Sequence, residues 1–344
     1  MKNYIGVDLG KQSSYFVVKD SQGKILKKMK IANDPSSLRA GLNEFASDQS
    51  QAVLEATCNY YWMYQQLSSL GISVKLAHPL KVRAIASAKI KNDRLDATIL
   101  ADLLRADLVP ESYIPTEKIR ALRELTRQHI RLTQIRTQIK NQCHSLLTKL
   151  NLQPTDELSD IFGQKGRLWL RSLSLPFVFE LQKTQLLDQI EYYNHLIQQT
   201  DWQIEKSLSL FPEAASLRNI PGIGKFGAAL LIAEIGNVHR FPSPKQLVGY
   251  AGLAPGLYES GQTSHSRGIT HQGNKFLRWI LCEIAHRHIR RPGNLRNFYL
   301  KIKTAKGHGK ALVATARKLL VSIYYELKKY QGFQNLDMPA TVPG

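Results

Sequence analysis

The chain has 344 residues, of which 43% are apolar, and its 47 Lys and Arg against 27 Asp and Glu give a formal net charge of +20. A chain this long and this apolar can bury hydrophobic cores in two or three domains of roughly 100–200 residues, which excludes a disordered basic tail. The positive charge predicts a polyanionic partner, nucleic acid ahead of an anionic membrane surface, with a merely basic soluble protein as the plainer alternative.

Two further classes are excluded by sequence patterns. Apolar runs such as 228–233 are far shorter than the roughly 20 residues that span a bilayer, and the chain begins with a strand-like pattern instead of a signal peptide. We therefore expect a cytoplasmic protein with no membrane contact. Cys58, Cys143 and Cys282 are scattered without a C-x-x-C pair, which favours small buried side chains over disulfides or a thiolate zinc site.

Residues 1–110 are predicted to form an α/β domain. Alternating apolar positions and turn signals predict three consecutive strands over 4–10, 14–19 and 24–31. Helices over 35–47 and 60–70 then alternate with strands over 51–55 and 72–77, and residues 79–106 are mostly helical. Alternation of this kind is typical of a layered sheet covered by helices.

Residues 111–212 are predicted to be helical. Apolar positions recur at spacings of three and four from 116 to 150, where eight Lys or Arg accompany one acidic residue between 118 and 149. A near-heptad run from 186 to 208 predicts a second long helix, and residues 151–178 indicate no clear element. The pair predicts a helical hairpin or coiled coil, either the core of an ordinary helical domain or a dimerisation arm.

The third segment, residues 213–336, is predicted to be a mainly helical C-terminal domain that carries most of the charge. Residues 217–344 hold 19 Lys and Arg and 5 Asp and Glu, a net +14, against +5 for 1–110 and +1 for 111–216. Residues 337–344 read as a flexible tail.

Four carboxylates in the first domain predict a metal site. Asp8 and Glu55 each close an apolar strand, and Asp93 and Asp96 stand three apart at the start of a helical run. In open α/β sheets, ligands gather outside the carboxyl ends of strands. Four carboxylates repel one another without cations, and their oxygens suit Mg²⁺, or Mn²⁺, in a clamp for phosphodiester cleavage. Taken singly, Asp93 also fits a helix N-cap and Asp96 a solvated charge.

A competing interpretation of the opening segment is disfavoured. The Gly6 to Gly10 sequence G-V-D-L-G also begins sugar kinases and actin-like ATPases. Those chains need a second glycine-rich phosphate loop and an adenosine loop, and neither is found here.

The segment Pro221-Gly222-Ile223-Gly224 predicts a helix-hairpin-helix. A glycine turn between two short helices exposes backbone N–H groups at the start of the second helix, where they hold a DNA phosphate without reading sequence. Lys225 adds a charge beside that phosphate. The alternative is a simple glycine turn between packed helices.

A polar, glycine-punctuated loop from 250 to 274, leading into a helix over 275–288, is the candidate for nucleophilic chemistry. Such a loop presents a hydroxyl beside cations that neutralise a phosphate, here Arg267, Lys275 and Arg278. The residue pattern alone does not single out one serine.

These segments, in this order, resemble the transposases of bridge-RNA-guided insertion sequences, which are related to the pilin-gene DNA invertases. The resemblance covers nearly the whole chain. It is carried by Gly6-Val7-Asp8, Glu55, 91–97, 220–224, 250–255, Ser260-Gly261, Gly268-Ile269 and Gly273-Asn274.

The resemblance implies a ribonuclease-H or RuvC-like first domain whose D-E-D-D tetrad, matching Asp8, Glu55, Asp93 and Asp96, binds Mg²⁺. It implies a serine nucleophile at Ser260, with Ser264 and Ser266 as fallbacks, that forms a phosphoserine link with DNA. It also implies a structured guide RNA that pairs with donor and target DNA, and a tetramer built from dimers. Thr270-His271-Gln272 replaces the Ser-Lys of many members, so Lys275 or Arg278 would supply the cation.

The predicted function is therefore that of a DNA transposase or recombinase guided by RNA. Guided base pairing agrees with a chain rich in Lys and Arg that shows no helix-turn-helix or zinc-finger signature. Two alternatives remain, a Holliday-junction-type endonuclease that uses the same tetrad with water, and a non-catalytic nucleic-acid-binding protein.

Overall fold

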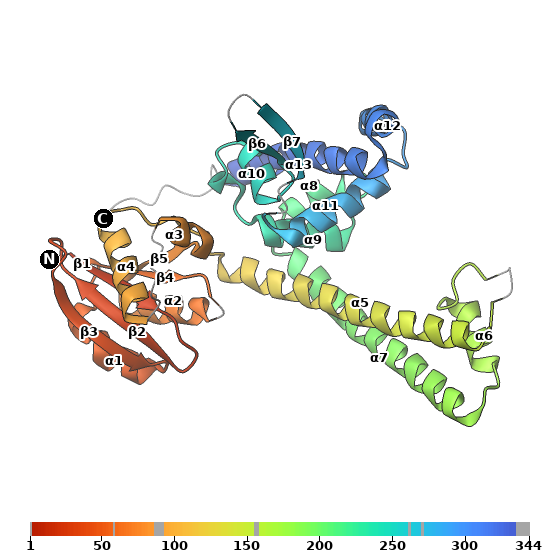
Figure 1. Ribbon diagram of the computed structural model, residues 1–344, viewed down its shortest axis with the longest axis horizontal. Helices are drawn as coiled ribbons and strands as arrows, with labels where there is room; N and C mark the ends of the chain where they lie inside the picture. The colour runs from red at the N-terminus through yellow and green to blue at the C-terminus, as the bar shows by residue number, and fades with distance from the viewer. Residues whose placement is uncertain are drawn as a thin grey trace. The chain divides into compact units, whose positions relative to one another are not determined.

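The computed structural model describes residues 2–57, 59–85, 93–154, 158–260, 263–269 and 272–334, with the backbone alone at 93–94, 255–267 and 331–334 (Figure 1). It divides into two compact units, Met1–Ile114 and Pro115–Gly344. The predicted segments 111–212 and 213–336 thus fall almost entirely in the second unit.

The first unit is built on a five-stranded sheet of order β3-β2-β1-β4-β5. The strands are β1 (Asn3–Asp8), β2 (Ser13–Lys19), β3 (Ile25–Ala32), β4 (Ser50–Glu55) and β5 (Ser73–Ala77). The first three pair antiparallel, and β4 and β5 extend the sheet in parallel with β1. The predicted three-stranded meander and the layered α/β arrangement are confirmed.

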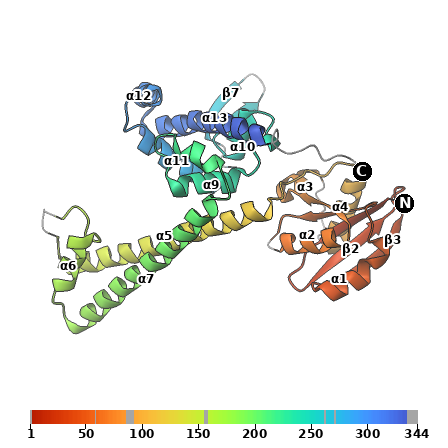
Figure 2. The same ribbon diagram turned by 180° about the vertical axis from the view of Figure 1, so that it is seen from behind.

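Helices cover both faces of this sheet (Figures 1 and 2). On one face, α1 (Pro35–Leu42) and α2 (Tyr60–Ser69) pack over Ile5, Val7 and Leu54. On the other, α3 (Pro79–Ile85) and α4 (Asp93–Arg105) pack over Val53 and Ala77. The predicted helix over 35–47 ends early, because the chain tightens into the 3₁₀ turn η1 (Asn43–Phe45), which buries Phe45 in the core.

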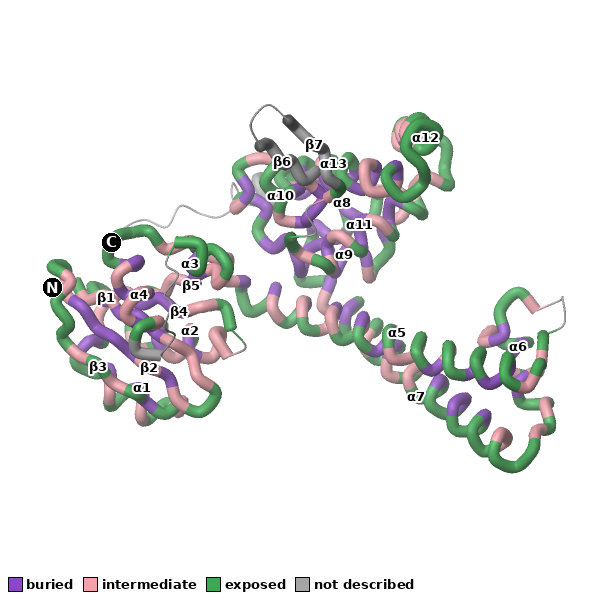
Figure 3. The backbone as a smooth tube through the Cα atoms, in the orientation of Figure 1, coloured by how far each residue is buried: buried purple, intermediate pink, exposed green. Residues whose placement is uncertain are grey.

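The second unit begins with two long helices, α5 (Glu117–Lys149) and α7 (Phe177–Leu208), which run antiparallel to each other (Figures 1 and 2). The short helix α6 (Gln164–Ser172), in a segment that had no predicted element, packs with their far ends. Their predicted apolar stripes are buried along the shared face, as Figure 3 shows in purple. We call this helical hairpin the arm.

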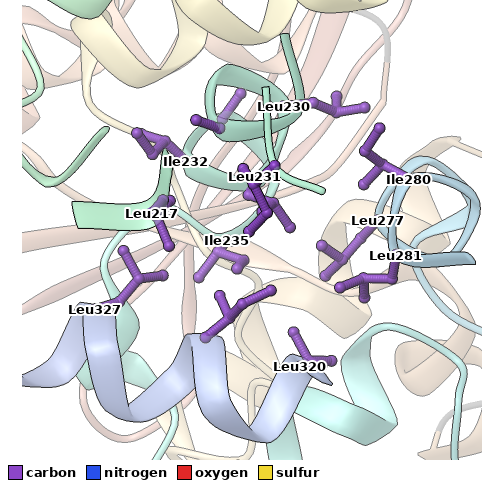
Figure 4. Packing of buried hydrophobic residues seen from close by; sticks show 14 of the residues in the cluster. Leu217, Leu230, Leu231, Ile232, Ile235, Leu277, Ile280, Leu281, Leu320 and Leu327 are labelled. Atoms are coloured by element: carbon purple, nitrogen blue, oxygen red, sulfur yellow. The ribbon is translucent and has the colours of Figure 1, made fainter. Parts of the chain in front are cut away.

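The rest of the second unit is mainly helical, as predicted. Its elements are α8 (Glu213–Arg218), α9 (Lys225–Ile235), η2 (Val238–Arg240), α10 (Pro244–Tyr250), β6 (Pro255–Ser260), β7 (Thr263–Ile269), α11 (Lys275–His288), α12 (Asn294–Lys306) and α13 (His308–Gln334). Helix α9 is buried from Gly227 to Ile235, and its Leu230, Leu231 and Ile235 pack between α8, α11 and α13 (Figure 4). Within the described ranges, no helix is long and apolar enough to cross a membrane.

Candidate active site

Asp8 and Glu55 lie on neighbouring strands at the same edge of the sheet. The parallel register pairs Val7 with Leu54, so the next residue on each strand is the acidic one. Adjacent strands are about 4.8 Å apart, and register neighbours point to the same face. Alternation puts both carboxylates on the face covered by α4, because Gly6, two residues before Asp8, lies directly against that helix. Both side chains are half-buried.

Helix α4 runs antiparallel to β1, which brings its start to this edge. A Cβ added at Gly6 would lie 1.9 Å from the carbonyl oxygen of Ala97, so only glycine permits this approach. Further along α4, Asp102 pairs with the buried Lys19, which stands opposite Tyr4 near the start of β1. The half-buried Asp96 is therefore directed to the end of β1 that carries Asp8, and Asp93 begins the helix there.

The four carboxylates of the predicted metal site come from the ends of β1 and β4 and from the start of α4. Among the described side chains, no three His, Cys, Asp or Glu lie close enough to hold an ion, and that set leaves out Asp93, whose side chain lies outside the described residues. The donors on the elements that meet at this edge are carboxylate oxygens, the ligands that Mg²⁺ prefers. The chemistry of these donors suits the predicted ion, while the described carboxylates Asp8, Glu55 and Asp96 do not lie close enough together to hold it by themselves.

Two amides hold the loop that follows Asp8. Asn33 and Asn59 both donate from Nδ2 to the carbonyl oxygen of Gly10, at 2.9 and 2.8 Å. A hollow of about 340 Å³ opens beside this loop, lined by Asp8, Lys11, Tyr15, Lys30 and three neighbours in the loop and at the start of β2. Lysines beside the carboxylate make this hollow suited to an anionic group such as a phosphate.

The predicted serine lies on a β-hairpin and not in an open loop. Among the described strands, β6 and β7 pair only with each other, and Ser260 pairs with Thr263 at the end next to the connecting residues. Ser264 and Ser266 occupy other registers, opposite Glu259 and Leu257. The expected loop is thus wrong in this part, because its alternating polar residues form a two-stranded ladder. The side chains of Ser260 and Arg267 lie outside the described residues.

The helix predicted after the hairpin, 275–288, is confirmed as α11. Lys275 is exposed at its first turn, with Nζ 5.2 Å from the ring centre of Phe276. Arg278 is half-buried against Gly252, where a Cβ would lie 2.4 Å from Nη1. Of these two predicted phosphate contacts, Lys275 is therefore the more accessible.

A glycine turn joins α8 to α9, as predicted for 221–224. Gly222 has a φ of +94°, and a Cβ there would lie 2.9 Å from the carbonyl oxygen of Ile284. Gly224 precedes α9, and no atom of the described residues lies within 4 Å of the position of its Cβ. Lys225 forms an ion pair with Glu205 of α7. The start of α9 is thus open to a ligand, while Lys225 already has an acidic partner.

A buried polar network that was not predicted from the sequence joins α5, α9 and the start of α11. Glu234 of α9 is fully buried and accepts hydrogen bonds from Arg127 of α5, at 2.8 and 3.0 Å, and from Asn274 Nδ2 at 2.6 Å. Asn274 also caps α11 through Oδ1, and its N–H donates to the carbonyl oxygen of Tyr250. The segments 250–255 and 273–274, separate in the sequence, thus meet at one buried carboxylate.

One signal for this network was available. Glu234 is the only charged residue within the apolar run 226–236. A carboxylate in a helix that is otherwise apolar all round requires a buried partner. The sequence does not say which of its many arginines provides that partner.

Comparison with known proteins connects both units to mobile DNA. Residues 5–152 match a family model described as a transposase, of the DEDD type of IS110, and residues 214–300 match the transposase family IS116/IS110/IS902. The chain is 24% identical to the transposase for insertion sequence element IS1111A of Coxiella burnetii, over 96% of this chain and 91% of the relative. It is 26% identical to the pilin gene-inverting protein of Moraxella bovis, over 96% and 98%. The transposase for insertion sequence element IS1328 of Yersinia enterocolitica is 26% identical, over 83% and 84%.

Proposed function

The chain belongs to the IS110/IS116 family of transposases and is a DNA recombinase, and we propose that it cuts and rejoins DNA with a serine nucleophile and a tetrad of carboxylates. The serine is Ser260, on the β6–β7 hairpin. The tetrad is Asp8, Glu55, Asp93 and Asp96. A structured RNA directs both to the donor and target DNA.

The serine step exchanges one ester bond to phosphorus for another. The Oγ of Ser260 forms an ester bond to phosphorus as the bond from phosphorus to the leaving sugar oxygen breaks, and the proton lost by the serine is balanced by protonation of that oxygen. Attack by the sugar hydroxyl of another strand then releases the serine and joins the strands. Lys275 and Arg278 at the start of α11 neutralise the phosphate during both steps, together with Arg267.

The tetrad supplies the second part of the site. When bound there, Mg²⁺, or Mn²⁺, stabilises negative charge on the reacting phosphate. Asp8 and Glu55 would hold the ion from the sheet, and Asp96 and Asp93 would hold it from α4. The close contact of Gly6 with Ala97 maintains the spacing between these two elements.

Sequence recognition is proposed to come from the guide RNA. The open glycine turn before α9 suits contacts with phosphates, which fix the position of a nucleic acid without reading its bases. Net charge of +14 in residues 217–344 supplies general affinity for DNA and RNA. In this helix-hairpin-helix, the residues proposed to contact the nucleic acid are Gly222, Gly224 and Lys225.

Oligomerisation of the arm, to a dimer and then a tetramer, completes the proposal. Three large apolar side chains near the far end of the arm are mostly exposed, namely Leu168 at 64%, Phe177 at 83% and Val178 at 66%. A patch of this kind is costly in water and is typical of a protein interface. A second copy would cover it and bring the tetrad of one subunit to the serine of another.

The observation that supports the proposal most is the meeting of β1, β4 and the start of α4 at one sheet edge. The test is a recombination assay on donor and target plasmids with the RNA transcribed from the DNA flanking the gene. Ser260→Ala and Asp8→Asn are expected to abolish product. Phosphoserine trapped on a suicide DNA substrate, and identified by mass spectrometry at residue 260, would give positive support.

Ser264→Ala and Ser266→Ala are the matched controls, because both serines lie on the partner strand of the same hairpin. They should retain product. Cleavage that persists in Ser260→Ala but not in Asp8→Asn would favour the endonuclease that uses water. Full recombination by Asp8→Asn would indicate that the tetrad has no catalytic role, and DNA binding without any cleavage would favour the binding protein.

A further inference from the structure

A basic groove in the second unit lies outside every site described above. It has a volume of about 970 Å³ and lies between α12, α13 and the end of β7. Phe298, Val313 and Val321 contribute its apolar, half-buried lining. Four exposed cations complete it, and they are Lys306, Lys310, Arg317 and Lys318. The groove thus combines an apolar floor with a charged rim.

The rim has no nearby acidic residues in the sequence to balance it. From residue 284 to 325 the chain has ten Lys or Arg and no Asp or Glu. Within the described part of the chain, no ion pair joins any of the four rim cations to a carboxylate. Like charges gathered along a concave surface add their potentials, so an anionic ligand is favoured there.

The cations are held on a rigid element. Lys310, Ala314, Arg317 and Val321 follow one another at intervals of three and four along α13, so they share one face. The opposite face of this helix, including Leu320, is buried in the core. Lys318 reaches across to α12, with Nζ 4.5 Å from the ring centre of Phe298. The rim is therefore formed before any ligand arrives.

We propose that this groove binds a single strand of DNA. The phosphates lie along the rim cations, and unpaired bases lie on the apolar floor. Proteins that hold single strands combine these two features, because exposed base faces need an apolar surface and the backbone needs positive charge. A duplex gains less from the floor, since its bases are stacked inside.

The choice of DNA rests on the proposed role of Ser260. The groove ends at the base of the hairpin, where Ile269 pairs with Pro255, and Ser260 lies at the other end of the same ladder. Five residues of strand span about 17 Å. A strand bound in the groove would therefore lie about the length of the hairpin from Ser260. Because the strand that Ser260 is proposed to attack is DNA, we assign DNA to the groove.

The test is fluorescence anisotropy with a labelled 12-nucleotide DNA strand of mixed sequence and the full chain carrying Ser260→Ala, in EDTA. Lys310→Ala/Arg317→Ala should weaken binding at least 10-fold and lower the salt dependence by about 1.4 in the log–log slope, since two phosphate contacts are lost. The same two substitutions should weaken the binding of a duplex of the same sequence less than they weaken the binding of the single strand. Because no cleavage is measured, the result does not depend on whether Ser260 is the nucleophile.

The matched control is Lys301→Ala/Lys329→Ala, which removes the same charge from α12 and α13 at positions outside the groove. It should weaken binding less than 3-fold. Equal weakening by both pairs, or none by either, would overturn the proposal, as would a loss confined to an RNA strand of the same sequence. If the groove pair fails to fold by circular dichroism, Ala314→Glu decides, because it adds a carboxylate to the floor and should weaken binding to the same degree.

Discussion

Arg127 of α5 holds the fully buried carboxylate of Glu234 in α9 with two parallel hydrogen bonds, from Nε to Oε1 at 2.8 Å and from Nη2 to Oε2 at 3.0 Å. Burial by itself would lower the pKa of Arg127, but the hydrogen bonds and charge of Glu234 outweigh burial and raise the pKa. Arg127 therefore stays charged, and its hydrogen bonds to Glu234 tie the arm to the residues that support the serine hairpin.

Glu234→Gln should destabilise the second unit by about 1.5–3 kcal/mol, because it removes the negative charge from the hydrogen bonds that Arg127 donates. Urea unfolding of the full chain followed by tryptophan fluorescence is the measurement. Glu205→Gln, which breaks the exposed pair with Lys225, should cost less than about 1 kcal/mol. Similar losses in the free energy of unfolding for both variants would show that the buried pair stabilises the fold no more than the exposed pair does.

His129 should make the second unit less stable in mild acid. Burial, with a smaller contribution from Arg136, lowers the pKa of His129, although Asp201 at 3.1 Å from Nε2 opposes this. Its ring also stacks on Phe226. The unfolded chain takes up the proton near pH 6.5, before the folded chain does, so stability falls as the pH drops below about 6.5.

Thermal unfolding at pH 7.5 and 5.5 tests this dependence. The change in Tm between the two pH values should be smaller in His129→Gln than in the wild type. The exposed His195 is the control, and His195→Gln should keep the full dependence. An unchanged dependence in His129→Gln would show that other groups cause it.

Gly222→Ala should cost about 1–3 kcal/mol, since its φ of +94° is unfavourable for alanine and its Cβ would press on the backbone of α11. Gly224→Ala should cost less than about 1 kcal/mol, because the space around it is open. Thermal unfolding compares the two. Binding of duplex DNA by Gly224→Ala, measured beside it, tests whether the added methyl group at the start of α9 obstructs a phosphate.

Gly6→Ala should reduce recombination without altering any carboxylate. Its Cβ would meet the backbone of Ala97 and Ala101, so α4 must move away from β1 and carry Asp96 with it. We expect about 1–3 kcal/mol of lost stability in the first unit, measured by chemical denaturation, together with loss of product. Gly41→Ala meets described side-chain atoms of Ile31 and Met29 as its nearest neighbours, with no backbone atom among them, so it should leave product formation intact. Normal recombination by Gly6→Ala would contradict the proposed spacing.

Local patterns in the sequence predicted where several candidate residues lie on the strands and helices. Asp8 and Glu55 end their strands as expected, since alternating apolar residues followed by a polar one mark where a buried strand stops. Helix α11 begins at Lys275 because Asn274 caps it. The predicted strand over 51–55 and the helix over 60–70 lie within one residue of β4 and α2 at each end.

Non-local pairing was not predictable in the same way. The ladder between β6 and β7 is formed by polar residues without a regular apolar face, so Ser260 was expected in a loop. The Lys225 ammonium, expected beside a phosphate, has Glu205 as a neighbour from a helix 20 residues earlier in the chain. Both outcomes depend on which segments pack together, and periodicity carries no information about that.

The sequence by itself determined the order of strands and helices, the acidic strand ends, the glycine turn and the concentration of charge after residue 216, because each of these depends on residues close together in the chain. Only the tertiary structure decided that α4 runs antiparallel to β1, that Arg127 meets Glu234 across 107 residues, and that α12 and α13 enclose a basic groove. The physical reason is that side chains distant in sequence become partners only when burial of the core selects one packing among many.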